Sequence, residues 1–284
     1  MTALRSASQT PEGISINARN VSFELEKSLA TDWADNDPFL TALFNAMSIS
    51  FPSGEKNFID SVRPYEKRIT DEKLLKEVKG FYKQEGIHSR EHRKYNKVLC
   101  EQRGYDLTKL EDVYLQRIEE GKLNPRVTQQ MMLASTVAVE HFTASFGESF
   151  LEGRLLKNVD GAIGDLWRWH SLEELEHKAV AFDVYNQTEG TYKMRKIIMR
   201  ITMLTLLKDF LNVTFKILRH DKQMWKWRTL KSLYKFLFSK NGFLRLHVDA
   251  YNDFFREDFH PWDTDNRALL EYWQEKLEPA MAAA

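Results

Sequence analysis

Two stretches of the chain place glutamate and histidine three and four residues apart. At about 100° per residue, side chains at this spacing lie on one face of a helix. Carboxylates and imidazoles on a buried face are costly unless they pair or bind a metal ion. Both stretches contain a Glu-x-x-His pair, and the sets are Glu85, His88 and His92 in the first stretch and His170, Glu174 and His177 in the second.

The repeated Glu-x-x-His pair indicates a centre for two metal ions. In helical bundles that bind two metals between carboxylates, two helices each provide such a pair and the other two each provide one Glu. Glu55 and Glu140 are the candidates for the single carboxylates. Glu55 and Glu85 lie equally far from a turn near residue 70, and Glu140 and Glu174 equally far from one near residue 157. Two residues that are equally far from the turn between antiparallel helices lie at the same height along the helix axes. The two members of each pair are therefore expected to lie side by side.

The donor types also narrow the choice of metal. Carboxylates and imidazoles without thiolates suit iron or manganese and, less specifically, zinc. The single cysteine, Cys100, excludes an internal disulfide and cysteine-rich zinc or iron–sulfur sites. We therefore expect two iron ions, with manganese or zinc as alternatives. His92 and Tyr95, on the same face as His88, are candidates for an extra ligand or for support of the ligands.

The order of these residues resembles that of the non-haem di-iron N-oxygenases. The seven ligands of that family run Glu, Glu-x-x-His, Glu, His-x-x-x-Glu-x-x-His. This chain matches the order at Glu55, Glu85, His88, Glu140, His170, Glu174 and His177. The resemblance implies an O2-activating oxidoreductase that uses an electron donor and whose carboxylates absorb the charge change of the iron.

Longer phrases resemble a bacterial family labelled "predicted metal-dependent hydrolase". They are SISFPSGE at 48–55, QEGIH at 84–88, WRWHSLEELEHK at 167–178 and FHPW at 259–262. The resemblance covers roughly residues 14–265 and implies, as the alternative activity, hydrolysis by a metal-bound water. A non-catalytic iron-binding protein is a further alternative.

A competing motif overlaps the first stretch. Residues 88–92 read His-x-x-Glu-His, the spacing of inverted zincins, in which both histidines hold one zinc and Glu91 would be the general base. Glu173 would be the third ligand. Otherwise Glu91, Glu173 and Glu176 lie about 100° or more from the ligand faces, where they are expected to face solvent or to support the ligands.

The elements that must position these residues are helices. Glycine and proline are scarce, at 12 and 7 of 284 residues, which argues against turn-rich β folds. A hydrophobic content of 43% is enough to fill a core. The sequence therefore predicts an all-α, ferritin-like four-helix bundle with extra C-terminal helices.

Capping residues and helix breakers give the expected bounds. Residues 1–35 lack helical periodicity and are expected to form an N-terminal arm, with a short strand or extended segment at 14–17. Asp71 and Gly104 are expected to bound one long helix, and Asp160 to begin a helix that runs to Gly190. The other expected helices run from Asp37-Pro38 to about 68 with a kink or new start at 51–54, over 107–120, from Asn124-Pro125 to Gly153, and through 191–240 and 243–284. The di-metal bundle then occupies 36–190, and a basic helical extension packed on it occupies 191–284.

The extension is strongly basic although the whole chain is neutral. Residues 191–240 hold 13 Lys or Arg and 2 Asp, whereas the chain has 41 Lys or Arg and 41 Asp or Glu. No apolar run is long and uncharged enough to span a bilayer. Cations mixed with aromatic residues favour a helix lying on an anionic membrane surface, and a solvated helix face or a homodimer contact is the alternative. The aromatic residues are Trp225, Trp227, Phe236 and Phe238.

The overall composition limits the partners. A neutral net charge argues against a nucleic-acid binder. The N-terminus lacks the apolar segment of a secretory signal. We expect a cytoplasmic protein, associated with the inner face of the membrane where the basic segment binds lipid. Its expected partners are an apolar or lipid-like small-molecule substrate, O2 and an electron donor.

Overall fold

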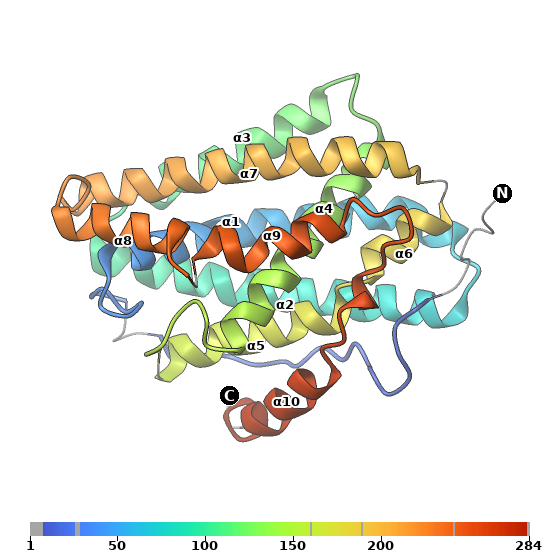
Figure 1. Cartoon of the computed structure of the whole chain (residues 1–284), viewed down its shortest axis with the longest axis horizontal. Coiled ribbons are helices and arrows are strands. Elements are labelled where there is room, and N and C mark those ends of the chain that lie inside the picture. The colour runs from blue at the N-terminus through green and yellow to red at the C-terminus, as the bar shows by residue number, and fades with distance from the viewer. Residues whose placement is uncertain (1–7, 26–28, 160, 189, 241, 283–284) are drawn as a thin grey trace.

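The computed structural model describes residues 8–25, 29–159, 161–188, 190–240 and 242–282 (Figure 1). Every regular element in these ranges is helical, which confirms the all-α prediction. The α-helices are α1 (Pro38–Val62), α2 (Glu72–Arg103), α3 (Leu107–Leu123), α4 (Gln129–Leu151), α5 (Gly161–His177), α6 (Val180–Gln187), α7 (Tyr192–His220), α8 (Trp227–Phe238), α9 (Phe243–Asp253) and α10 (Arg267–Ala282). Two short 3-10 helices span Arg63–Arg68 and Pro261–Asp263.

The bounds of α2 follow from its capping residues. Asp71 accepts a hydrogen bond from the Leu74 amide at 2.6 Å and so caps the first turn. Gly104 ends the helix in the left-handed region at φ 69°, which costs a glycine little. Both ends lie where the sequence predicts them. The helix is therefore one uninterrupted element across Glu85, His88 and His92.

Some predicted boundaries are wrong. α1 continues through 51–54 with Pro52 inside it, so no new helix starts there. Asn124 ends α3 rather than starting α4, because a residue before proline disfavours the helical conformation, and Thr128 caps α4 instead. The helix expected to reach Gly190 is interrupted after His177 and resumes at Val180. Asp160 lies outside the described residues, so its predicted capping role is not described.

Two helix pairs form the core. α1 packs along α2, and α4 packs along α5, while α6 contacts α4 and α2. A Cβ added at Gly147 in α4 would lie 3.1 Å from the Ser171 carbonyl oxygen in α5, so the glycine permits this close pairing. α7 lies across α1 and α4, and α10 packs on α5 at the opposite side of the molecule (Figure 1). The four helices α1, α2, α4 and α5 therefore enclose the interior of the bundle.

The N-terminal arm crosses the bundle without forming a strand. Residues 14–17 have no regular secondary structure and belong to no sheet within the described part of the chain. A side chain at Gly80 of α2 would collide with the Ile16 carbonyl oxygen, so the arm lies directly on that helix. The arm continues beneath α2 and α5 (Figure 1). It thus brings residues from the start of the chain to the outer face of the helices that carry the Glu-x-x-His pairs.

The C-terminal helices cover the other face. α7 contacts α1, α3 and α4, and α8 and α9 pack on α1 and α4 respectively. Trp225 and Trp227, at the start of α8, are 78% and 77% exposed. Among the described helices, none combines the length and the apolar character needed to cross a membrane. The division of the chain into an arm, a bundle and an extension stays a prediction.

Candidate metal centre

The seven predicted ligands converge in the interior of the bundle. α1 contributes Glu55, α2 contributes Glu85 and His88, α4 contributes Glu140, and α5 contributes His170, Glu174 and His177. All seven are buried. Their donor atoms form three overlapping groups, each with its members within 4.8 Å of one another: Glu55, His88 and His170; Glu85, Glu140 and His177; and Glu85, His88 and Glu174.

Glu174 occupies the middle of the cluster. Its Oε1 atom lies 3.0 Å from His170 Nε2, 3.6 Å from His88 Nδ1 and 3.6 Å from His177 Nε2. His177 Nε2 also lies 3.2 Å from Glu85 Oε1 and 3.4 Å from Glu140 Oε2. The two Glu-x-x-His pairs therefore face each other across the bundle. This agrees with the expectation that residues at equal distances from a turn lie at the same height on antiparallel helices.

Many of these donor atoms lack a hydrogen bond, which is rare for buried polar groups. Within the described structure, neither carboxylate oxygen of Glu55, Glu85 or Glu140 has a hydrogen-bond partner. Glu174 Oε2, His88 Nδ1 and His177 Nε2 also have none. Since these atoms face one another and are buried, cations bound between them would satisfy them together. The residues present therefore fit a pair of metal ions.

The electrostatics of the cluster point the same way. Burial and then the charge of Glu174 raise the pKa of Glu55, and burial and then Glu140 raise the pKa of Glu85. Burial raises the pKa of Glu140 to about 7. His177 has a raised pKa because the carboxylates of Glu140 and Glu174 outweigh its burial. The cluster holds more carboxylates than nearby positive charges. Bound cations would supply the missing charge and allow all of the carboxylates to ionise.

The far side of each imidazole is held by a neighbour. His88 Nε2 lies 3.0 Å from Glu173 Oε2, and His177 Nδ1 lies 3.0 Å from Gln84 Oε1. Both partner atoms are acceptors, so these ring nitrogens carry the proton and donate. The opposite nitrogen of each ring is then a lone-pair donor aimed at the cluster. This is the arrangement in which proteins fix the orientation and tautomer of metal-binding histidines.

His170 is held through a longer chain of hydrogen bonds. His170 Nδ1 donates to His92 Nε2 at 2.7 Å, and His92 Nδ1 donates to Ser48 Oγ at 2.9 Å. Ser48 Oγ donates to Asn96 Oδ1 at 2.7 Å, and Asn96 Nδ2 returns a bond to the Ser48 carbonyl at 3.0 Å. Pro52, four residues after Ser48, has no N–H to occupy that carbonyl. His92 uses both ring nitrogens and so supports His170 rather than joining the ligands.

The geometry does not favour the other readings of this helix. Tyr95 donates its hydroxyl to Asn45 Oδ1 at 2.5 Å, away from the cluster. Glu91 accepts from Arg90 Nε at 2.6 Å and Lys94 Nζ at 2.9 Å, so it is not placed as a base. No group of three close donors in the described residues includes His92. The inverted-zincin interpretation is therefore wrong in this structure.

Of the two expectations for Glu91, Glu173 and Glu176, exposure to solvent is wrong, whereas Glu173 does support a predicted ligand by accepting from His88. Glu173 and Glu176 are fully buried, and Arg19 from the N-terminal arm pairs with both of them, at 2.9 Å and 2.5 Å. Gln84 Nε2 donates to Glu176 Oε2 at 2.8 Å while its carbonyl holds His177. Sequence analysis missed Arg19 because the arm has no periodicity. The one available signal was the pair of carboxylates on a core helix, which demands a cation.

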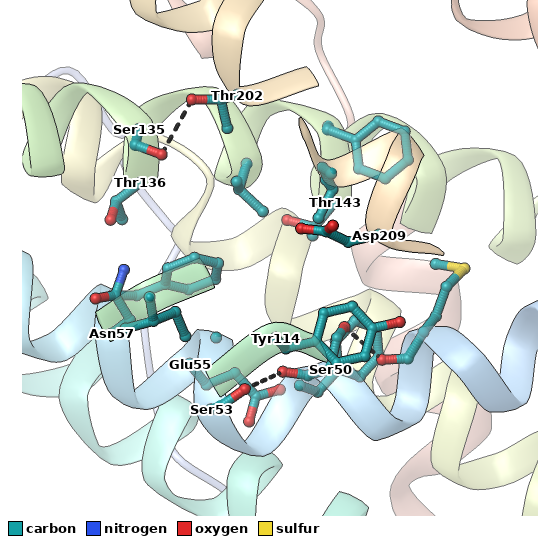
Figure 2. Close-up of a pocket in the computed structure, with 18 of the residues that line it drawn as sticks. Ser50, Ser53, Glu55, Asn57, Tyr114, Ser135, Thr136, Thr143, Thr202 and Asp209 are labelled. Atoms are coloured by element: carbon teal, nitrogen blue, oxygen red, sulfur yellow. Dashed lines mark hydrogen bonds between the residues drawn. The ribbon is translucent and has the colours of Figure 1, made fainter. Parts of the chain in front are cut away.

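A cavity of about 150 Å³ reaches the cluster from the side of α7. Glu55, His170 and Glu174 form its inner wall. Figure 2 shows Glu55 at one edge and hydroxyl groups around the space, and the hydroxyls of Ser53, Ser135 and Thr202 are hydrogen-bonded within the wall. On the outer side, Arg117 Nε pairs with Asp209 Oδ2 at 3.1 Å. The cavity therefore offers a small polar group access to the predicted ligands.

His141 is next to Glu140 but plays no part in the cluster. Its Nε2 donates to the Ala250 carbonyl at 2.7 Å, and its ring packs against Phe254 and Phe259. Neighbouring positions on a helix point about 100° apart, so only one of the two can face inward. Glu140 is the inward residue.

Comparison with known proteins gives one match. Neither a curated protein nor a solved structure matches the chain, so the ferritin-like architecture and the likeness to di-iron N-oxygenases stay predictions. The family model described as "Predicted metal-dependent hydrolase" matches residues 17–265. The match spans the arm from residue 17 onward, all seven converging residues and the C-terminal helices through α9. The chain belongs to this family of predicted metal-dependent hydrolases.

Proposed function

We propose that this chain is an enzyme that holds two metal ions inside the bundle. The supporting observation is the set of buried, unpartnered carboxylate and imidazole atoms that converge from four helices. Two of the three donor groups share Glu85, and two share His88, which suits a pair of neighbouring ions better than one. The proposed ligands are Glu55, Glu85, His88, Glu140, His170, Glu174 and His177.

Hydrolysis is the first candidate reaction, and the family description supports it. A bound pair of metal ions would supply Lewis acidity and a nucleophilic water at neutral pH. The residues of the chain would hold the ions, keep bulk water out and admit the substrate through the cavity beside Glu55 and Glu174. His170 borders that cavity, and its Nδ1–H donates a hydrogen bond to His92. Its ring is therefore fixed in orientation and is not a free base.

Oxidation with O2, by two irons and an electron donor, is the second candidate. The observation that favours it is the position of His170. Its Nε2 lies 3.0 Å from Glu174 Oε1 and 3.9 Å from Glu55 Oε1, so all seven positions of the oxygenase order lie in one cluster. A third imidazole makes the donor set richer in nitrogen than the minimal carboxylate plan of four Glu and two His.

Separate metal forms of the protein distinguish the two reactions. Metal-free protein is loaded with zinc, manganese or, under anoxia, ferrous iron, and each form is assayed with model esters and phosphoesters. Hydrolysis predicts turnover by a redox-inert form that is equal in air and under strict anoxia. Failure of every form to hydrolyse, together with O2 uptake and a ferric absorption band in the iron form, overturns hydrolysis and supports oxidation.

The same preparations test whether there is a centre at all. We expect elemental analysis to find two ions per chain in the parent protein and far fewer in Glu174→Ala. Tight binding of iron with neither hydrolysis nor O2-dependent turnover of any added compound would support the non-catalytic alternative. A single tightly bound ion would contradict the proposal of a two-metal site.

A further inference from the structure

A second, larger cavity lies beside the one that reaches the predicted metal ligands. It has a volume of about 530 Å³ and lies between α1, α4, α7, α8 and α9. Its walls are mostly apolar, with Leu43, Phe146, Met203, Leu237 and Val248 among them. We call this space the apolar groove. The smaller cavity, which we call the polar cavity, is lined in part by hydroxyl groups (Figure 2).

The two spaces share a wall. Met47, Phe142, Leu206 and Phe210 line both the apolar groove and the polar cavity. Met47 and Phe210 are buried, whereas Phe142 and Leu206 are half-buried. From the predicted ligands Glu55 and Glu174, the lining therefore changes first to hydroxyl groups and then to a mostly apolar surface.

The outer end of the apolar groove is open and remains apolar. Leu204, Leu207 and Leu244 line it and are 69%, 51% and 50% exposed. Arg200 is among the lining residues and belongs to the basic segment at 191–240. Exposed apolar side chains that are clustered at one opening are typical of a binding site. A cation at the border of the groove favours an entering molecule that carries a negative charge.

We propose that the apolar groove holds the hydrocarbon chain of an amphiphilic substrate with one chain and a small anionic or polar head. The head would lie in the polar cavity against the metal centre, and the chain would extend past Leu206 and Phe210 to the opening. The reaction at the head rests on the proposed function. Binding of the chain depends only on the groove, and so it is tested without metal.

The experiment measures binding of a fluorescent polyene fatty acid to metal-free and to metal-loaded protein. Saturated fatty acids of increasing length then displace the probe. We expect both forms to bind, and the affinity of the competitors to rise about fourfold for each added CH2 until the groove is filled. Metal content is measured on the same samples, so loss of the metal centre and loss of chain binding are separate results.

Two matched variants locate the site. Leu207→Glu places a carboxylate in the wall of the groove and is expected to weaken binding by about tenfold or more. Leu115→Glu makes the same change on α3 at a residue that lines neither cavity and is 47% exposed, against 51% for Leu207, and it should bind as the parent does. Equal binding by both variants, or an affinity independent of chain length, overturns the proposal. Binding of phospholipid vesicles without binding of free fatty acid also overturns it and assigns the exposed leucines to a membrane contact.

Discussion

A single oxygen atom organises the buried cluster. Glu174 Oε1 lies within 3.6 Å of a ring nitrogen of His88, His170 and His177, and each of those rings is held from behind by another side chain. Glu174 keeps a lowered pKa because His177 and His170 outweigh the effect of its burial. The two imidazoles therefore favour the charged form of this carboxylate.

Replacing this carboxylate should remove the metals. We expect Glu174→Ala and Glu85→Ala to lose most bound metal, since both residues belong to the group that joins the two halves of the cluster. Glu91→Gln should keep both ions, because Glu91 binds Arg90 and Lys94. Elemental analysis of the three variants checks this. Loss of metal from Glu91→Gln alone would contradict it.

Sequence pattern found the inward residues of the site but not the residues behind them. The seven converging residues share helical spacing and two mirrored hairpins, so their convergence follows from geometry alone. Ser48, Gln84 and Asn96 act through contacts between helices, and a pattern along one helix does not contain those contacts. Arg19 lies in a segment without periodicity and acts on Glu173, 154 residues away. Pairing over such separations depends on the tertiary fold.

Among the structural elements, the N-terminal arm has the least regular structure, yet it provides the cation that pairs with two buried carboxylates. Arg19 is the cation for two buried carboxylates, Glu173 and Glu176. Arg19→Met leaves both without it, and removing one partner of a buried ion pair costs about 3–5 kcal/mol. Urea unfolding should show a loss of this size. Arg267→Met, which breaks an exposed pair with Asp265, is the control, and its unfolding free energy should stay close to that of the parent.

The attachment of α9 to α4 should be sensitive to acid. Burial, with the charge of Arg154 and the nearby His141, lowers the pKa of His247 to about 4 from 6.5. Between pH 6.5 and about pH 4, His247 binds a proton in the unfolded chain but not in the folded protein. The free energy of unfolding therefore falls as the pH drops. At pH 5 the loss is about 2 kcal/mol.

A variant without the titrating ring isolates this effect. His247→Asn retains a side chain that can bond to Ser145, the partner of His247 Nδ1 at 2.8 Å. We expect its unfolding free energy to change less than that of the parent between pH 7 and pH 5 in parallel urea titrations. Equal changes in the two proteins would show that the acid sensitivity arises elsewhere.

Helix interiors were more predictable than helix ends. Periodicity and capping gave α2 at both ends, because Asp71 and Gly104 act locally. The predicted start of α4 was wrong, since Asn124-Pro125 resembles a cap but the chain turns once more before Thr128. The break after His177 had no local signal. At that point Lys178 Nζ binds the Thr264 carbonyl at 2.8 Å and Asn266 Oδ1 at 2.5 Å, which are contacts made by the far end of the chain.

The charge of the whole molecule is balanced but unevenly distributed. Residues 191–240 hold 13 Lys or Arg and 2 Asp, and the same region exposes Trp225, Trp227, Tyr234 and Phe238. Each cation near an anionic membrane contributes about 1 kcal/mol, and aromatic rings add binding that salt does not screen. A peripheral membrane location therefore stays our proposal, alongside a homodimer contact through the same face.

Co-sedimentation with liposomes tests the membrane contact. We expect the parent protein to pellet with anionic liposomes at low salt, less at high salt, and little with neutral liposomes. Trp225→Ala/Trp227→Ala should lose the salt-resistant part. Tyr272→Ala, which removes an exposed aromatic ring on α10, is the control and should pellet like the parent. A parent protein that stays in the supernatant with anionic lipid at low salt contradicts the contact.

Pro52 affects both the stability of α1 and the orientation of the predicted ligand His170. The proline denies α1 one hydrogen bond, and the Ser48 carbonyl receives Asn96 instead, at the end of the chain that orients His170. A proline inside a helix costs about 3 kcal/mol relative to alanine. Selection for thermostability should therefore favour Pro52→Ala, whose restored N–H would compete with Asn96 for the carbonyl. Heat tolerance and activity would then diverge in such a selection, at a residue that is not a predicted ligand and lines neither cavity.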